Sequence, residues 1–163
     1  MSLPASRVLG VVLARAAGGR VLALWPSQEP GVAEAIERRV RELAHAAEQR
    51  DLGDLTDGVS ERFRSKEGWS KAEAKRVLAA QVLRGEWLRV FVADLSAQEE
   101  SPTRGTFRAK LLFARSESQS LETLARDSVT SAYLLEGAFE REEDGTWRVV
   151  QVSHRRLGPT ELF

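Results

Sequence analysis

The fold is decided by residues 139–150, FEREEDGTWRVV. Apolar residues stand on both sides of Asp144-Gly145, and an Asp-Gly pair in that setting is a strong signal for a tight β-hairpin. The hairpin joins a strand predicted at 129–141 to a last strand predicted at 147–154. Because the two arms of a hairpin run antiparallel, the C-terminal part of the chain is predicted to build an antiparallel sheet.

The pairing register of this hairpin has two alternatives. A two-residue turn would pair Leu135 with His154 and direct His154 to the inside of the fold. A three-residue loop would pair Phe139 with Val149, which directs Gln151 inside and His154 outside, because a slip of one residue exchanges the two faces. We favour the three-residue loop, since it gathers the apolar residues of both arms on one face.

Two further strands are predicted before the hairpin, at 87–95 and 106–115. The second alternates between apolar and polar residues, whereas the first is apolar on both faces and is therefore expected to be covered on both. The polar residues 96–105 are predicted to form the loop between these strands. With a longer excursion at 116–128, the strands make a four-stranded meander.

Three helices are predicted ahead of the meander. Apolar residues three and four apart indicate an amphipathic helix from Gly31 to about Gln49. Asp51 suits the N-cap of a short second helix, and residues 59–63 form a short strand. A capping box of Ser70 and Glu73 begins the third helix. Helices followed by antiparallel strands predict an α+β domain with helices on one face of the sheet.

These features resemble the nuclear-transport-factor-2-like (SnoaL-like) cone-fold superfamily over about residues 30–157. The resemblance rests on the helix-to-helix corner at residues 49–52, the capped helix that leads into a long strand, and the closing Asp-Gly-x-Trp-Arg hairpin. It implies a strongly curved antiparallel sheet wrapped around the long N-terminal helix, often in a dimer, with an apolar pocket at one end of the cone. The superfamily includes isomerases, dehydratases, cyclases and pocket-only binders, so the fold does not fix the function.

Composition excludes several kinds of site. Lys and Arg number 24, as do Asp and Glu, so the charge balance gives no indication of a nucleic-acid partner. With no cysteine and two histidines, we expect no metal and no cofactor. Residues 1–29 are predicted to be an extension with a weak export or anchor segment, too interrupted by arginine for a stable membrane span. The domain is expected at 30–163, in the cytoplasm unless that segment directs export.

Seven side chains are candidates for the site. Asp51 and His154 are weak acid or base candidates, although a helix cap alone would explain Asp51. The others combine an expected inward position with a polar or aromatic group that could contact a ligand in the cone pocket. These predicted ligand-binding residues are Gln81, Trp87, Phe91, Tyr133 and Gln151.

Three functions are compatible with this pattern. The leading hypothesis is a non-catalytic domain that binds a small apolar ligand in the cone pocket, associates with itself through the sheet, or does both. The second is an enzyme of the isomerase, dehydratase or cyclase type, which needs two of Asp51, Tyr133 and His154 to converge on one cavity. The third is an accessory interaction domain, suggested by apolar residues on the second face of the 87–95 strand, Leu88, Val90 and Val92.

Overall fold

Three helices, with one short strand between the second and the third, precede the four-strand meander in the structure, as predicted. The computed structural model describes residues 29–163, so the predicted export or anchor segment lies almost wholly outside the described residues. Residues Gly31–Phe163 form one compact unit. Its helices are α2 (Val32–Glu48), α3 (Leu52–Asp57) and α4 (Lys71–Arg84), and its strands are β1 (Val59–Ser65), β2 (Arg89–Ser101), β3 (Arg104–Ala114), β4 (Val129–Arg141) and β5 (Trp147–Arg156).

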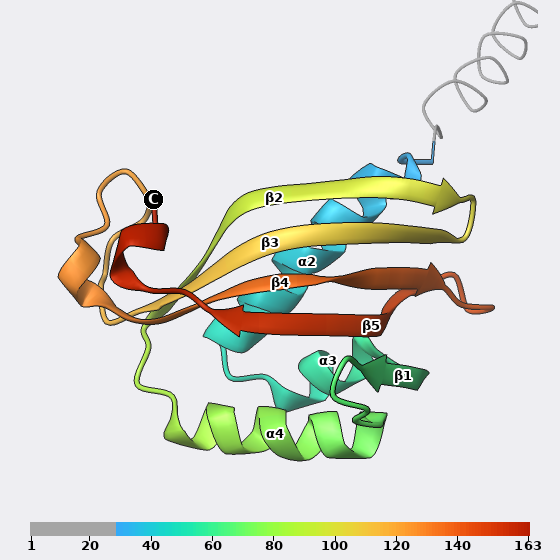
Figure 1. Cartoon of the computed structure of the whole chain (residues 1–163), viewed down its shortest axis with the longest axis horizontal. Helices are drawn as coiled ribbons and strands as arrows, with labels where there is room; N and C mark the ends of the chain where they lie inside the picture. The colour runs from blue at the N-terminus through green and yellow to red at the C-terminus, as the bar shows by residue number, and fades with distance from the viewer. Residues whose placement is uncertain (1–28) are drawn as a thin grey trace, which may run out of the picture. The chain divides into compact units, whose positions relative to one another are not determined.

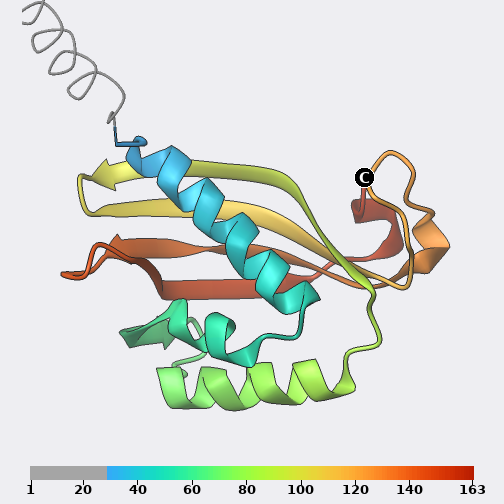
Figure 2. The same cartoon turned by 180° about the vertical axis from the view of Figure 1, so that it is seen from behind.

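The five strands form one open sheet in the order β1-β5-β4-β3-β2 (Figure 1). The last four strands are the predicted antiparallel meander, but β1 pairs parallel with β5, so the sheet is mixed. Helix α2 crosses one face of the sheet, here called the inner face (Figure 2). The opposite face is called the outer face. This arrangement confirms the predicted α+β class and corrects the purely antiparallel sheet.

The prediction of a loop at residues 96–105 is wrong. Strand β2 continues to Ser101 and β3 begins at Arg104, so Pro102 and Thr103 alone make the turn. The segment is polar because no helix covers this half of the outer face, so its strand residues meet solvent there. Polarity was therefore a sign of an open sheet face and not of a loop.

Regular alternation along β2 would put Phe91 and Leu95 on the same face of the sheet, but the structure puts them on opposite faces. Asp94 has a φ of 48°, and the pairing with β3 is irregular between Ala93 and Ser96. This β-bulge inserts an extra residue and so exchanges the two faces of the strand. Leu95 consequently packs against the α2 cluster, whereas Phe91 lies in a cluster on the outer face.

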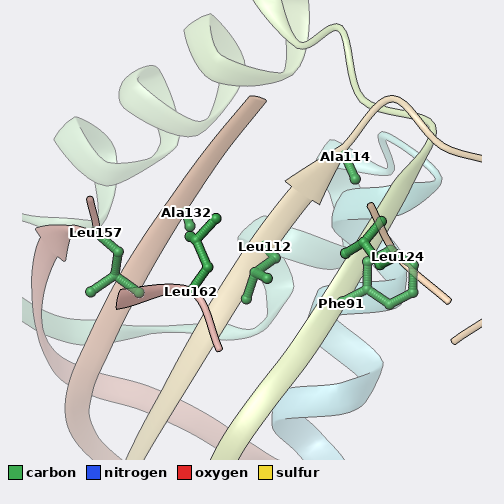
Figure 3. Packing of buried hydrophobic residues seen from close by; sticks show 7 residues of the cluster. All are labelled: Phe91, Leu112, Ala114, Leu124, Ala132, Leu157 and Leu162. Atoms are coloured by element: carbon green, nitrogen blue, oxygen red, sulfur yellow. The ribbon is translucent and has the colours of Figure 1, made fainter. Parts of the chain in front are cut away.

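Both faces of the sheet carry a hydrophobic core. On the inner face, Ile36 of α2 packs among strand residues that include Phe107 and Phe139. On the outer face, the loop after β3 and the segment after β5 cover the strands at one end of the sheet (Figure 3). This outer cluster contains Phe91, Leu112, Ala114, Leu124, Ala132, Leu157 and Leu162. The first strand of the meander is therefore covered on both faces, as its composition predicted.

A tight corner joins α2 to α3. Arg50 has a φ of 56° and its N–H donates to the Ala47 carbonyl at 3.1 Å, while the Asp51 N–H donates to the Ala46 carbonyl at 2.9 Å. These two bonds form a Schellman motif with arginine where glycine is usual. The Asp51 carboxylate accepts from the Asp54 N–H at 2.9 Å, which confirms the predicted N-cap.

Helix α4 begins as predicted but does not cover the sheet. The Glu73 carboxylate accepts from the Ser70 N–H at 2.7 Å, in agreement with the predicted capping box. The helix runs along the β1 edge, beside α3, and Ala74 is its one fully buried residue (Figures 1 and 2). Gln81 is exposed, so its predicted burial is wrong. The helical period of the sequence predicts that α4 has an apolar stripe, but it does not predict which part of the molecule that stripe contacts.

Candidate functional site

The hairpin uses both predicted registers in succession. Next to the loop, Phe139 pairs with Val149, and Gly145 is left-handed with a φ of 81°, as in the favoured three-residue loop. The pairing then shifts between Ala138 and Phe139, and beyond the shift Leu135 pairs with His154. The bulge that absorbs the extra residue therefore returns His154 to the inner face.

Two predicted orientations are corrected by this bulge. His154, expected outside, lies on the inner face opposite Leu135. Gln151, expected inside, pairs with Ala138 and lines a groove on the outer face. The loop chemistry was interpreted correctly, but a bulge several residues away leaves no local signal in the sequence.

Five inner-face rings form a continuous series, here called the aromatic row. Ring centroids are 4.9 Å apart for Trp87 and Phe113, 6.2 Å for Phe113 and Tyr133, 6.4 Å for Tyr133 and His154, and 6.0 Å for His154 and Trp69. Trp87 is buried, Tyr133 and Trp69 are half-buried and His154 is exposed. The row therefore starts in the core and ends at a surface open to solvent.

The buried end of the aromatic row is fixed by the α2–α3 corner. The Trp87 indole N–H donates to the Ala47 carbonyl at 3.0 Å. The guanidinium of Arg50 lies 5.0 Å from the centre of the Trp87 ring and donates to the Trp87 carbonyl at 2.7 Å. The residues 49–52 that carried the family resemblance thus hold one end of the row.

The open end of the aromatic row carries polar groups without protein partners. Among residues 29–163, no hydrogen bond engages the Tyr133 hydroxyl, the Trp69 indole N–H or the His154 ring nitrogens. Indole and phenol groups in proteins usually find such a partner when they are buried. Three unpartnered groups beside half-exposed rings are therefore available to a ligand.

The structure brings three of the seven predicted site residues together. Trp87 and Tyr133 lie in the aromatic row with His154, so the row unites two predicted ligand residues with one predicted acid or base. Phe91 belongs instead to the outer core, and Asp51 caps α3. Of the three candidate acid–base groups, Tyr133 and His154 alone are neighbours in ring contact.

Two members of the aromatic row, Phe113 and Trp69, were not among the predicted site residues. Phe113 lies in the alternating strand predicted at 106–115, where it shares an apolar face with Leu111, and that shared face was the available signal. Trp69 lies in the connection between β1 and α4, where nothing in its neighbourhood predicts contact with a residue of β5. Its placement depends on the parallel pairing of β1 with β5, including the bond from the Lys66 N–H to the Val152 carbonyl at 3.1 Å.

The outer face carries a separate, open groove of about 620 Å³. Its floor is a row of largely uncharged residues that crosses the four strands: Gln98, Thr106, Ala138 and Gln151. On one side of this floor row, Arg108 pairs with Glu136 at 3.1 Å. On the other side, Glu140 pairs with both Arg104 and Arg62 at 2.7 Å. Rows of alternating charge therefore flank an uncharged floor.

The charges beside the groove are mutually stabilised. Although partial burial opposes it, hydrogen bonds from Arg104 and Arg62 hold the pKa of Glu140 below its usual value. Arg104 also pairs with Glu100 at 2.8 Å. Within the described residues, no cluster of His, Asp and Glu has the geometry of a metal site. No helix of the described region is long and apolar enough to cross a membrane.

Comparison by sequence finds no match, since no family model and no curated protein matches the chain. Comparison by structure finds many. A protein of unknown function with a cystatin-like fold from Nostoc punctiforme superposes with a TM-score of 0.57 at 12% identity, over 79% of this chain and 93% of the other. A proposed dehydratase of the NTF2-like family from Streptomyces avermitilis gives 0.58 at 12% identity, over 76% and 95%.

A third match is a ketosteroid isomerase-like protein from Erwinia carotovora atroseptica, with a TM-score of 0.54 at 15% identity over 77% of this chain and 95% of the other. The names of these three proteins differ in function, and the identities are low, so the likeness concerns the fold. The α2–α3 corner, the capped helix α4 that leads into the long strand β2, and the closing hairpin are the features on which the resemblance in the sequence rested. The chain has the NTF2-like cone fold.

Proposed function

We propose that the aromatic row binds a small, largely apolar ligand that carries a hydrogen-bonding group. The supporting observation is that the Tyr133 hydroxyl, the Trp69 indole N–H and the His154 ring have no hydrogen-bond partner among the described residues and lie beside half-exposed rings. Contact with aromatic rings supplies affinity, because stacked or edge-on rings contribute about 0.5–1.5 kcal/mol per pair beyond the area that they bury. The free polar groups orient the ligand.

A neutral bicyclic probe tests this site. We expect 2-naphthamide to bind the full chain and to change its tryptophan fluorescence, because Trp69 stands at the open end of the row. Replacement W69L should weaken binding about tenfold, in keeping with the loss of one aromatic contact. Trp147 lies at the other end of the inner face, so W147F is the matched control. Equal binding by wild type and W69L would contradict the proposal.

We also propose that the protein forms a homodimer through the outer groove. Positive side chains of β3 beside the groove stand directly opposite negative side chains of β4. The charge pattern is therefore complementary to its own copy when that copy is turned about a line that runs parallel to the strands, between β3 and β4. In a second copy rotated by 180° about that line, Glu136 would face Arg108 of the first copy, and Glu140 would face Arg104 of the first copy. The same rotation would bring Gln98 against Gln151 of the second copy. Charge complementarity of this kind fixes the orientation of an interface.

Sedimentation at rising protein concentration tests the dimer. We expect wild type to form dimers, and the Q98E/Q151E variant to stay monomeric because four carboxylates would meet in the interface. Mixing this variant with Q98K/Q151K should restore a dimer of one copy of each. Q81E, which changes an exposed glutamine on α4, is the control. A monomeric wild type at every concentration, or dimers of Q98E/Q151E alone, would contradict the proposal.

A further inference from the structure

The Arg155-Arg156 pair at the end of β5 is divided between the two faces of the sheet. Arg155 pairs with Leu134 in the ladder, and its guanidinium forms an ion pair with Glu161 at 2.9 Å on the outer face. Arg156 pairs with Tyr133, and so lies on the inner face beside the aromatic row. Two adjacent arginines therefore have different environments, because successive strand residues point to opposite faces.

Arg156 has no partner in the described part of the chain. It is exposed, and neither a hydrogen bond nor an ion pair engages its guanidinium among residues 29–163. Directly opposed residues in an antiparallel ladder have Cβ atoms about 4.5–5.5 Å apart. The Arg156 side chain thus leaves the strand next to Tyr133, and a guanidinium is the group that binds a carboxylate with two parallel hydrogen bonds.

The free groups at the open end of the aromatic row are mostly hydrogen-bond donors. Arg156 and the Trp69 indole can only donate, the Tyr133 hydroxyl can do so, and an imidazole carries at least one N–H. A carboxylate is the complementary ligand group, because it accepts hydrogen bonds and does not donate them. The nearby acidic side chain is Glu67, whose charge interacts with His154. Hydrogen bonds from its own backbone N–H and from Ser65 already hold that carboxylate.

We infer that the ligand of the aromatic row is a small aromatic or otherwise apolar carboxylic acid, whose carboxylate is bound by Arg156 and whose apolar body lies against Trp69 and Tyr133. This inference rests on the proposed ligand-binding function and adds the chemical class of the ligand. Arg156 determines specificity in this account, because apolar contact alone would accept neutral molecules of the same shape.

Paired probes with one ring system separate charge from shape. Binding of 2-naphthoate and of 2-naphthamide to the full chain is measured by titration calorimetry at pH 7.5. We expect naphthoate to bind about tenfold more tightly to wild type, since a charge-assisted hydrogen bond contributes that much. R156Q should abolish this preference, because it should weaken naphthoate binding more than naphthamide binding. R155Q, one residue away on the opposite face, is the matched control and should retain the preference.

Each other result has a defined meaning. If both probes bind equally to wild type, or R155Q and R156Q lose the preference equally, the inference about the carboxylate is wrong while ligand binding at the row stands. If neither probe binds at millimolar concentration, the proposed ligand-binding function fails with it. R156K, which keeps the charge but not the planar fork, should give an intermediate preference. Far-ultraviolet circular dichroism establishes that each variant is folded before it is titrated.

Discussion

The guanidinium of Arg50 and the indole of Trp87 hold each other at the α2–α3 corner. The Arg50 Nη2 donates to the Trp87 carbonyl at 2.7 Å and to the Gly85 carbonyl at 3.0 Å, and its Cζ lies 5.0 Å from the centre of the Trp87 ring. A residue in a left-handed conformation at the end of α2 thus fixes the start of β2 and the buried end of the aromatic row.

Replacing Arg50 should separate its side-chain contribution from its backbone contribution. We expect R50A to lower the free energy of unfolding by about 1–3 kcal/mol, through loss of the charge-assisted hydrogen bonds and the cation–π contact. R50G should lose about 1 kcal/mol less, because glycine adopts a positive φ without steric cost. Urea unfolding of the three proteins measures both differences. Equal stability of R50A and wild type would show that the contacts of the Arg50 guanidinium with Trp87 and Gly85 contribute nothing to the free energy of unfolding.

Asp51 is expected to act through capping and not through chemistry. D51A should destabilise the protein by about 1 kcal/mol, because the Asp54 N–H loses its acceptor. D51S should recover most of this stability, since a serine hydroxyl also accepts at an N-cap. Binding of 2-naphthamide should be the same for all three proteins. A D51S variant that is stable but does not bind the probe would instead assign Asp51 to the site.

Gly137 is expected to be intolerant of any side chain. A Cβ added there would lie 2.1 Å from the backbone carbonyl oxygen of Gln151 and 3.0 Å from a Phe107 ring carbon. G137A should therefore cost about 1–3 kcal/mol, because β4 and β5 would have to separate. G158A is the control, since its Cβ would meet only a glutamate oxygen at 3.6 Å. Thermal unfolding compares the two, and equal melting temperatures would contradict the close approach of these strands.

The Asp144–Arg148 pair should make stability depend on acidic pH. Hydrogen bonds from Arg148 and from the Thr146 backbone lower the pKa of Asp144 from 3.8 to about 2. Because the folded-state pKa is the lower one, ionised Asp144 stabilises the fold above pH 3.8, and this contribution is lost as the pH falls towards 2. The stability difference between wild type and D144N should therefore be constant near neutrality and decline below about pH 4.

Urea midpoints at a series of pH values measure this decline. D127N, which changes an exposed aspartate without an ion pair among residues 29–163, is the control. A wild-type advantage over D144N that stayed constant down to pH 2 would show that Arg148 does not depend on the ionised carboxylate.

Features with a local cause were predictable from the sequence. The Asp51 cap, the Ser70 capping box and the left-handed Gly145 each depend on residues within one turn or loop, and all three occur as expected. The order of helices and strands also follows from local period. These local agreements were sufficient to suggest the cone fold, although no sequence comparison finds a family.

Features that depend on distant packing were not predictable. The bulge at Asp94 places Phe91 and Leu95 on opposite faces, and the register shift beside Phe139 exchanges the faces of β5. Phe91, Gln151 and His154 therefore lie on other sides than predicted. Gln81 was expected to be buried because α4 has an apolar stripe, but α4 runs along the sheet edge. A periodic pattern reports which residues share a face and not which neighbour that face will meet.

The register shift in the closing hairpin has a consequence for evolution. Near the loop, compensating substitutions in β4 and β5 should occur between partners such as Phe139 and Val149. Beyond the shift, the coupled partners should step by one position, as for Leu135 and His154. In homologous sequences, the pairs of positions that covary along this hairpin should therefore shift by one residue at a single place, Val150. A lineage that lost the Val150 codon would keep these strand pairings and regain a straight β5, with the loss of one buried side chain.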